Sequence, residues 1–452
     1  MTEAIRKRLS ESTGARWTAL ILVSFTMMCG YFVTDVMSPL EDMLVKSGWT
    51  SSEYGCFAGS YGYINVFLLM LFFGGIILDK CGIRFTGIMS ASLMTIGALI
   101  KYAALAHNFG DQMLFGMHMQ VIYTSLGFAI FGVGCEISGI TVSKIIVKWF
   151  TGHELALAMG IQVALARIGT AAALCFSLPF AKHFGNHASA SVLLGVVLLI
   201  IGLLFYLIYC VMDKKEDDAT ASATVEKEEG FKLHDLVLIF KSRGFWLITI
   251  LCVLFYSGVF PFLKFATKLM IYKYSVPEDL AGLIPALLPF GTILLTPVFG
   301  SLYDRIGHGA ALMIIGSVIL TIVHIGFAIP MLSSYYLAIA LMILLGIAFS
   351  LVPSAMWPSV PKIIPMKQLG SAYAIIFYIQ NIGLALVPVL IGWVIDKCST
   401  IVDASGKIIG YDYTLPMTIF AVFGICAVIV STLLLLDDRK FHYGLEEPNI
   451  KK

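Results

Sequence analysis

The sequence predicts an all-α membrane protein whose twelve transmembrane helices form two pseudo-symmetric six-helix bundles. Of its 452 residues, 59% are hydrophobic and only 13% are charged. A soluble protein of this length needs far more charged residues to cover its surface. Apolar stretches recur along the whole chain, and motifs of its first half return in the second. These observations exclude a soluble fold and favour a duplicated membrane domain.

A transmembrane helix needs about 20 mainly apolar residues. Segments that meet this requirement cover residues 17–40, 52–78, 86–107, 115–147, 155–182, 189–212, 244–272, 280–302, 309–331, 335–361, 368–396 and 412–436. Between the sixth and seventh segments, DKKEDDATASATVEKEEGFKLHD (213–235) is charged and rich in small residues, which is typical of a solvated linker. We therefore expect an N-terminal bundle over 1–212, a cytoplasmic linker over 213–243 and a C-terminal bundle over 244–452.

The lysine and arginine positions predict the orientation in the membrane. With the N-terminus inside, most of the 30 Lys and Arg residues lie on the internal side. This excess follows the positive-inside rule, so we expect both termini to be cytoplasmic. The exceptions are Lys46, Lys182, Lys273, Lys397 and Lys407 in external loops, and Lys101, Arg167, Lys264 and Lys268 at membrane depth.

A short motif occurs at equivalent places in the two halves. GIILDKCGIR (75–84) lies between the second and third segments, and GSLYDRIGHG (300–309) between the eighth and ninth. Its charged residues are Asp79, Lys80 and Arg84 in the first half and Asp304 and Arg305 in the second, and we select Asp79, Arg84, Asp304 and Arg305 as candidate gate residues. Such charges at the inner mouth can pair in one state and separate in another, which predicts a gate. The alternative is ordinary charge next to the membrane.

A second repeat begins the fifth and eleventh segments. ELALAMGIQVALARIG (154–169) aligns with QLGSAYAIIFYIQNIG (368–383), and Arg167 stands opposite Asn381. Duplication of six transmembrane helices is typical of carriers that work by rocking two bundles.

Several longer blocks indicate a family, among them YFVTDVMSPL (31–40), SYGYINVFLLMLFFGGIILDKCGIR (60–84), FWLITILCVLFYSGVFPF (245–262) and AMWPSVPKIIPMKQLGSAYAIIFYIQNIGLAL (355–386). The chain resembles the major facilitator superfamily, in particular its lysosomal dipeptide uniporter branch. This resemblance implies dipeptide transport by alternating access, as a uniporter or coupled to protons. The N-terminal stretch MTEAIRKRLSES has no acidic dileucine signal, and the chain has no Asn-x-Ser/Thr sequon. We therefore expect a prokaryotic relative in the bacterial inner (plasma) membrane.

Two opposite charges lie near the middle of predicted helices, Glu136 in the fourth and Arg167 in the fifth. A charge at the bilayer centre costs about 2.5–3.5 kcal/mol and usually has a partner or faces water. The pair is either a structural salt bridge or a clamp for a zwitterionic substrate. The resemblance implies the clamp, with Glu136 at the amino end of a dipeptide and Arg167 at its carboxylate. Because Arg167 has Asn381 as its counterpart, we favour the functional interpretation.

Other polar residues at membrane depth are weaker candidates. Asp35 is a proton carrier for coupling, a partner of Lys264 or Lys268, or a helix-end residue facing external water. The two lysines share one face of the seventh helix and either serve this pairing or extend to the outer interface. Lys101 is expected to extend to the lipid interface. For substrate binding we select Tyr31, Tyr61, Tyr256 and Trp357 inside the family-like blocks, together with Asn381 and Lys268.

Two further functions compete with dipeptide transport. An organic-anion or nitrate-type carrier would use Arg167 with the two lysines of the seventh helix, but Glu136 would then repel the substrate. A non-transporting membrane sensor or scaffold would need neither the duplicated gate nor buried charges. No enzymatic motif is present, so we expect no catalytic site, no cofactor, no metal site and no nucleic-acid partner. The expected partners are a small-molecule substrate and the lipid bilayer, and the sequence is silent on an accessory subunit.

Overall fold

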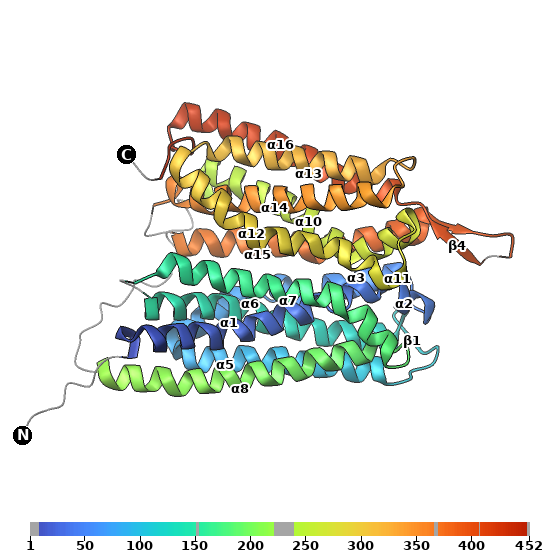
Figure 1. The fold of residues 1–452 in the computed structure, drawn as a ribbon, viewed down its shortest axis with the longest axis horizontal. Coiled ribbons are helices and arrows are strands. Elements are labelled where there is room, and N and C mark those ends of the chain that lie inside the picture. Colours follow the sequence, from blue (N-terminus) through green and yellow to red (C-terminus); the bar gives the residue numbers. More distant parts are fainter. Residues whose placement is uncertain (1–8, 151–152, 221–238, 366–368, 406, 450–452) are drawn as a thin grey trace, which may run out of the picture.

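The long helices lie in two layers, one from each half of the chain (Figure 1). The computed structural model describes residues 9–150, 153–220, 239–365, 369–405 and 407–449. Both termini lie at one end of the helices, and two short β-hairpins lie toward the other (Figure 1). We call these the terminus end and the hairpin end. The hairpins pair β1 (Met113–Leu114) with β2 (Met117–His118) and β3 (Thr400–Val402) with β4 (Ile408–Tyr411).

The N-terminal half consists of α1 (Thr13–Asp35), α2 (Glu41–Lys46), α3 (Ser51–Ser60), α4 (Tyr63–Phe67), α5 (Met70–Ala106), α6 (Met119–Phe150), α7 (Leu155–His183) and α8 (Ala188–Thr220). Short 3-10 turns lie at Leu9–Glu11 and Ser38–Leu40. The C-terminal half consists of α10 (Arg243–Tyr274), α11 (Glu278–Ala281), α12 (Leu283–Ile306), α13 (Gly309–Ala328), α14 (Tyr335–Ile363), α15 (Leu369–Val394), a π-helical turn (Ile395–Ser399) and α16 (Thr414–Phe441).

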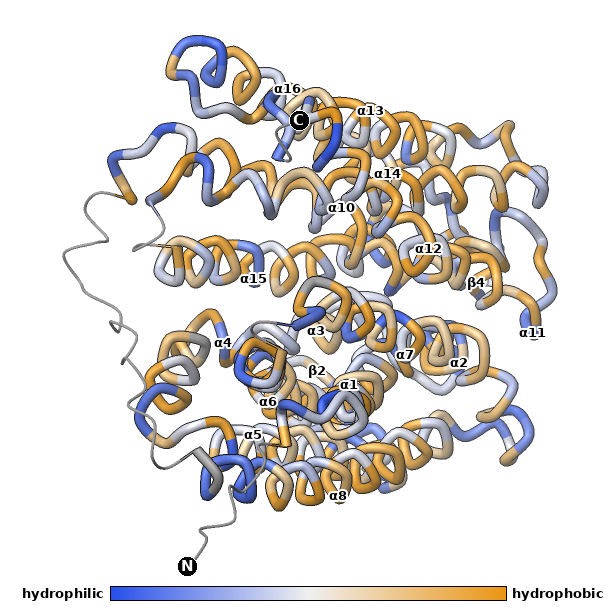
Figure 2. The backbone as a smooth tube through the Cα atoms, turned by 60° about the vertical axis from the view of Figure 1, so that its left-hand side comes forward, coloured by the Kyte–Doolittle hydropathy of each residue, from blue (hydrophilic) through white to orange (hydrophobic). Residues whose placement is uncertain are grey.

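The predicted all-α membrane class is confirmed. Within the described ranges, 11 helical segments are long and apolar enough to cross a membrane. Hydrophobic colouring dominates these helices, and hydrophilic segments gather near their ends (Figure 2). This is the pattern that a bilayer imposes, because its hydrocarbon core requires mainly apolar side chains along each span while the helix ends meet water.

The second predicted segment, 52–78, is not one continuous helix. It forms α3, α4 and the beginning of α5, and Leu69 takes a left-handed conformation with φ 54° before α5. At Gly62, next to the first break, a Cβ would lie 2.9 Å from the Ala385 Cβ of α15. The break thus coincides with a close contact between the two halves. Hydropathy reports only that this stretch is apolar, so it predicts the span without its breaks.

The repeated motif has a shared backbone feature. Gly82 lies inside α5 with φ 77°, where the second and third predicted segments meet, and Gly307 follows α12 with φ 73°. Glycine adopts positive φ without the steric cost that a Cβ brings. Each glycine stands three residues after the motif aspartate, so both halves turn sharply at the same place.

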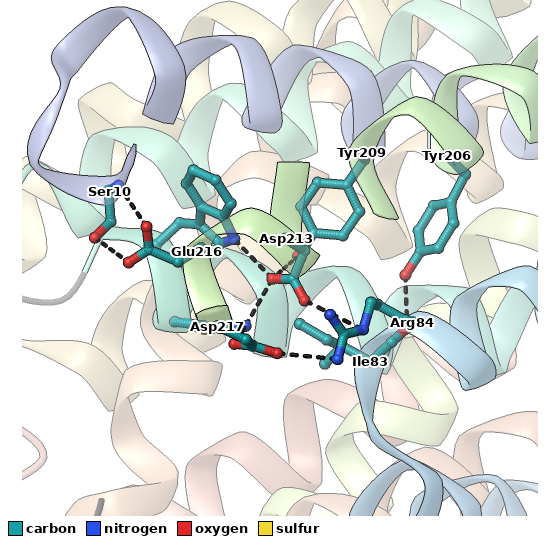
Figure 3. Close-up of polar contacts among 10 residues, drawn as sticks. Ser10, Ile83, Arg84, Tyr206, Tyr209, Asp213, Glu216 and Asp217 are labelled. Carbon is teal, nitrogen blue, oxygen red and sulfur yellow. Dashed lines mark hydrogen bonds and ion pairs between the residues drawn. The ribbon is translucent and has the colours of Figure 1, made fainter. Parts of the chain in front are cut away.

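The helix α8 extends past residue 212, where the sequence predicted a linker to begin. Asp213 is buried in α8 and receives hydrogen bonds from Tyr209 (3.0 Å) and Lys148 (2.7 Å). Asp217, one turn later, pairs with Arg84 at 3.1 Å (Figure 3). These pairs hold the charged end of α8 against the N-terminal half. Residues 221–238, the centre of the predicted linker, lie outside the described residues.

The two halves are joined most firmly at the hairpin end. There α3 packs directly on α15: a Cβ on Gly55 would lie 2.4 Å from the Pro388 carbonyl oxygen, and one on Gly59 would lie 2.1 Å from that of Ala385. Among the described residues, every ion pair between the halves is on this side. The pairs are Asp35–Lys264 (2.6 Å), Glu41–Lys268 (3.2 Å), Lys46–Glu278 (2.7 Å), Lys182–Glu278 (2.9 Å) and Lys182–Asp279 (2.7 Å).

Candidate functional site

Glu136 lies in the middle of α6 and is partly exposed. The Tyr61 hydroxyl donates a hydrogen bond of 2.8 Å to its Oε1. Tyr61 stands at the end of α3. A Cβ on Gly132 of α6 would lie only 2.1 Å from the Tyr61 carbonyl oxygen. The absence of a side chain at Gly132 therefore lets the break in the second segment approach α6. This approach brings the tyrosine to the carboxylate.

Arg167, in the middle of α7, lies among aromatic rings. Its Cζ is 5.6 Å from the ring centroid of Tyr31, 5.3 Å from that of Phe260 and 5.2 Å from that of Phe349. Tyr31 belongs to the N-terminal half, whereas Phe260 (α10) and Phe349 (α14) belong to the C-terminal half. A guanidinium group within about 6 Å of a ring centroid is attracted to the ring face. Arg167 is thus held between the halves by rings from both.

Glu136 and Arg167 do not form an ion pair with each other in the described part of the chain. The hydrogen-bond partner of Glu136 is the Tyr61 hydroxyl, whereas Arg167 lies beside the Tyr31 ring. Glu136, Arg167 and Tyr31 are all partly exposed although they lie well inside their helices. The two residues therefore do not form the structural salt bridge between α6 and α7 that was one of the two interpretations of the pair. Two opposite charges lie at membrane depth beside different tyrosines, Tyr61 and Tyr31, and neither neutralises the other.

The aromatic residues selected in the second half lie beside the rings around Arg167. The Trp357 indole N–H donates to the Tyr256 hydroxyl oxygen at 3.0 Å. The Tyr256 ring is 5.5 Å from Phe260 and 5.6 Å from Phe349. The structure thus connects Tyr256 and Trp357 to Arg167 through the two phenylalanines. Phe260 and Phe349 were missed from the sequence, since among 31 phenylalanines nothing marks these two.

Asn381 in α15 is 2% exposed. Its Nδ2 donates to the Phe377 carbonyl oxygen at 3.0 Å, and its Oδ1 is buried without a hydrogen-bond partner in the described structure. Phe377 in turn stacks on Trp357, with ring centroids 4.9 Å apart. The counterpart of Arg167 in the repeat therefore adjoins the same aromatic group from the C-terminal half.

The structure does not bring Lys268 to this group. Lys268 is buried at the hairpin end, where its Nζ donates to Glu41 (3.2 Å) and to Ser51 Oγ (2.9 Å). Asp35 is the partner of Lys264, at 2.6 Å, and also accepts from Thr170 at 2.8 Å. Three interpretations were open for Asp35, and in the structure it is the ion-pair partner of Lys264 from the seventh predicted segment.

The gate residues of the repeated motif form contacts only within their own halves in the described structure. Asp79 pairs with Lys144 at 2.7 Å, and Arg84 pairs with Asp217 of α8 (Figure 3). Asp304 accepts from Asn449 at 2.8 Å, and Arg305 is exposed. Among the described residues, the terminus end therefore has none of the cross-half ion pairs that join the halves at the hairpin end.

A family model decides the class of protein. The model described as Major Facilitator Superfamily matches residues 20–388 and 263–448, which together span most of the chain. The chain belongs to the major facilitator superfamily. It is a multi-pass membrane transporter of small molecules and not an enzyme, as the sequence predicted.

Relatives within the superfamily confirm the predicted resemblance. The lysosomal dipeptide transporter MFSD1 of Bos taurus is 29% identical over 394 residues, which cover 84% of this chain and 80% of that protein. The MFSD1 protein of Homo sapiens is 28% identical over 391 residues with the same coverage. The uncharacterized transporter YfkL of Bacillus subtilis is 30% identical over 120 residues, 26% of this chain and 29% of that protein.

Solved superfamily structures share the fold. A point mutant of the nucleoside transporter NupG has a TM-score of 0.70 at 18% identity, covering 92% of this chain and 98% of that chain. Tetrameric PepTSo2 has a TM-score of 0.64 at 16% identity, covering 95% of this chain and 99% of that chain. At these identities the likeness establishes the fold alone.

Proposed function

We propose that this major facilitator transporter carries dipeptides by alternating access, with Glu136 binding the amino end and Arg167 the carboxylate. The observation that supports this proposal is that the two opposite charges form no ion pair with each other: Glu136 is hydrogen-bonded to Tyr61, and Arg167 lies among aromatic rings. The MFSD1 relatives are named dipeptide transporters, which agrees with it. Halves corresponding to 1–212 and 244–452 would rock about the site.

The chemistry of the two side chains suits a zwitterion. Arginine holds a carboxylate through two parallel hydrogen bonds, which lysine cannot do. A carboxylate opposite it can accept the terminal ammonium group. Recognition of the two ends leaves the substrate side chains unread, so broad specificity would follow. The aromatic group of Tyr256 and Trp357 offers apolar surface for those side chains.

The orientation and state of the transporter are part of the proposal. From the excess of Lys and Arg on one side, we infer that the terminus end is cytoplasmic and the hairpin end external. The cross-half ion pairs then close the external side, and the conformation is inward-facing. We also infer a prokaryotic plasma membrane, because the sequence carries no Asn-x-Ser/Thr glycosylation site.

The anion-carrier alternative loses its main support. It relied on Lys264 and Lys268 as further positive charges beside Arg167. Both lysines are already paired with carboxylates at the hairpin end. Glu136 remains at membrane depth in α6, hydrogen-bonded to Tyr61, where it would repel an anion. Dipeptides fit this set of charges better.

Dipeptides with an amidated C-terminus are expected to bind about ten- to a hundredfold more weakly than free dipeptides. Amidation removes a charge-assisted contact with Arg167, worth about 1.5–3 kcal/mol. Isothermal titration of the purified protein with alanyl-alanine and its amide measures the ratio of the two Kd values. An N-acetylated dipeptide tests Glu136 in the same way. Equal affinities for the free and amidated forms would remove Arg167 from the proposed role.

Tyr61→Phe is expected to weaken dipeptide binding by about tenfold or less without loss of folding. The hydroxyl orients the Glu136 carboxylate through one hydrogen bond, and such bonds contribute about 0.5–1.5 kcal/mol net. Tyr63→Phe is the matched control, because no hydrogen bond from the Tyr63 hydroxyl is found in the described structure. Kd values for alanyl-alanine provide the comparison. If both variants bind equally well, Tyr61 does not position Glu136.

A further inference from the structure

The first turn of α3 is completed by a side chain from the other half of the chain. A helix leaves its first four backbone N–H groups without partners inside the helix, so other groups must satisfy them. In α3 these groups belong to Thr50, Ser51, Ser52 and Glu53. Thr50 and Glu53 form a capping box, in which the Thr50 N–H donates to Glu53 Oε2 at 2.9 Å and the Glu53 N–H donates to Thr50 Oγ1 at 3.1 Å. The N–H groups of Ser51 and Ser52 remain for an acceptor outside the helix.

Asp396 supplies this acceptor from the C-terminal half. Its Oδ1 accepts from the Ser51 N–H at 2.8 Å, and its Oδ2 accepts from the Ser52 N–H at 2.5 Å. Within the described residues, these are the only hydrogen bonds of the Asp396 carboxylate. A carboxylate suits this position, because a helix N-terminus carries partial positive charge. The first turn of α3 is therefore fully satisfied by protein groups only while the two halves are in contact.

The end of α15 is shaped for this approach. Pro388, Gly392 and Asp396 follow one another at intervals of four residues, so they lie toward the same side of the helix. A Cβ on Gly392 would lie only 2.3 Å from the Ser51 carbonyl oxygen, so the missing side chain lets the two backbones meet. Asp396 itself belongs to the π-helical turn with which the helix ends. Turns of this kind are rare and occur frequently at functional sites.

A second contact from the C-terminal half reaches the same serine. Lys268 Nζ donates to Ser51 Oγ at 2.9 Å and to Glu41 Oε1 at 3.2 Å. Ser51 is 1% exposed, so its N–H is shielded from water in this conformation. Both the backbone and the side chain of Ser51 are thus bound across the halves.

Alternating access requires the halves to part at the hairpin end, which separates α3 from α15. Opening gives the carboxylate and both N–H groups to water, so the contact favours the closed state only by the difference between the two environments. Hydrogen bonds to a charged group keep a net advantage over hydration. We propose that Asp396 is a latch of the hairpin end, which holds the closed conformation by capping α3 from the opposite half. The inference rests on the alternating access of the proposed function but on no particular substrate.

The test follows opening in single molecules without substrate. Fluorescent labels on Phe115→Cys and Met331→Cys, in exposed loops of the N-terminal and C-terminal halves at the hairpin end, report the separation by resonance energy transfer. The full chain in nanodiscs is used, with its nine native cysteines replaced by alanine. The dwell times at short and long separation give the ratio of open to closed molecules, and they count rare openings as well.

Asp396→Ala should raise the ratio of open to closed molecules by about ten- to a hundredfold, because it removes both hydrogen bonds to a charged group. The change should appear as shorter dwell times in the closed state, since the contact exists only there. Asp396→Asn keeps one acceptor oxygen without the charge, so it should shift the ratio in the same direction but less. The Asn variant also provides the test if the Ala variant folds poorly.

Asp412→Ala is the matched control. Asp412 lies at the same end and accepts from the Thr414 N–H at 2.9 Å, at the start of α16 in its own half. Losing this cap affects the closed and open states alike, so the ratio should stay at the wild-type value. The latch is wrong if both Asp396 variants keep the wild-type ratio, or if Asp412→Ala shifts it as much. Either result would leave dipeptide binding by Glu136 and Arg167 untouched, because no substrate is present.

Discussion

Glu136→Gln is expected to leave a folded protein whose uptake of dipeptides falls by about one to two orders of magnitude. The substituted amide keeps the size of the side chain and still accepts the Tyr61 hydrogen bond. It has no negative charge for the terminal ammonium group, and a charge-assisted contact contributes about 1.5–3 kcal/mol. Uptake of alanyl-alanine into proteoliposomes, together with the melting temperature of the purified variant, measures both effects.

Folding is the part of this result that separates a binding role from a structural one. Breaking a buried salt bridge typically costs about 3–5 kcal/mol, because one charge is left uncompensated. Arg167 is held by the rings of Tyr31, Phe260 and Phe349 instead of by Glu136, so the variant creates no newly unpaired arginine. The melting temperature should therefore change little.

Glu154→Gln is a matched control with the same chemical change. Glu154 is half-exposed and pairs with Arg16 at 3.5 Å at the terminus end, away from the proposed site. Its uptake should remain close to that of the wild type. The binding role of Glu136 is wrong if its Gln variant transports normally, or if it unfolds while the Glu154 variant does not.

The fold could be predicted because the bilayer acts on simple properties of the sequence. Long apolar stretches, the sidedness of Lys and Arg and the repeated Asp79 and Asp304 motifs all report on it directly. The motif glycines Gly82 and Gly307 even share their positive φ. The breaks at Tyr61 and Leu69 could not be read in the same way, because they depend on where α15 and α6 approach the chain.

The candidate site was only partly visible in the sequence. Glu136 and Arg167 stand out because charges are rare at membrane depth. The sequence does not show that the two charges form no ion pair, because this depends on how Tyr31, Phe260 and Phe349 are placed around the guanidinium in the folded protein. Lys101 and Lys268 are both buried, although Lys101 was expected to extend to the lipid interface. A lysine near a helix end has the same sequence signature whether it reaches the interface or lies buried.

Gly59→Ala is expected to shift the transporter toward a conformation that is open at the hairpin end, with a corresponding loss of uptake. A Cβ on Gly59 would lie 2.1 Å from the Ala385 carbonyl oxygen, and backbone atoms cannot move away as a side chain can. Overpacking of this kind typically costs about 1–3 kcal/mol. Since that cost applies only while α3 and α15 are in contact, the equilibrium should shift by about 5- to 150-fold.

The same substitution at Gly160 is the control. Gly160 lies in α7, where a Cβ would meet nothing within 4 Å, so Ala gains the same helix propensity there without a collision. Spin labels on Asp111→Cys and Ser333→Cys, in exposed loops of the two halves at the hairpin end, report the separation by pulsed electron paramagnetic resonance once the nine native cysteines are replaced by alanine. This separation should lengthen in Gly59→Ala and stay unchanged in Gly160→Ala. Because the atoms that crowd Gly59 all belong to the C-terminal half, neither half loses its own packing. A Gly59 variant with wild-type separation and uptake would mean that the contact between α3 and α15 does not close the hairpin end.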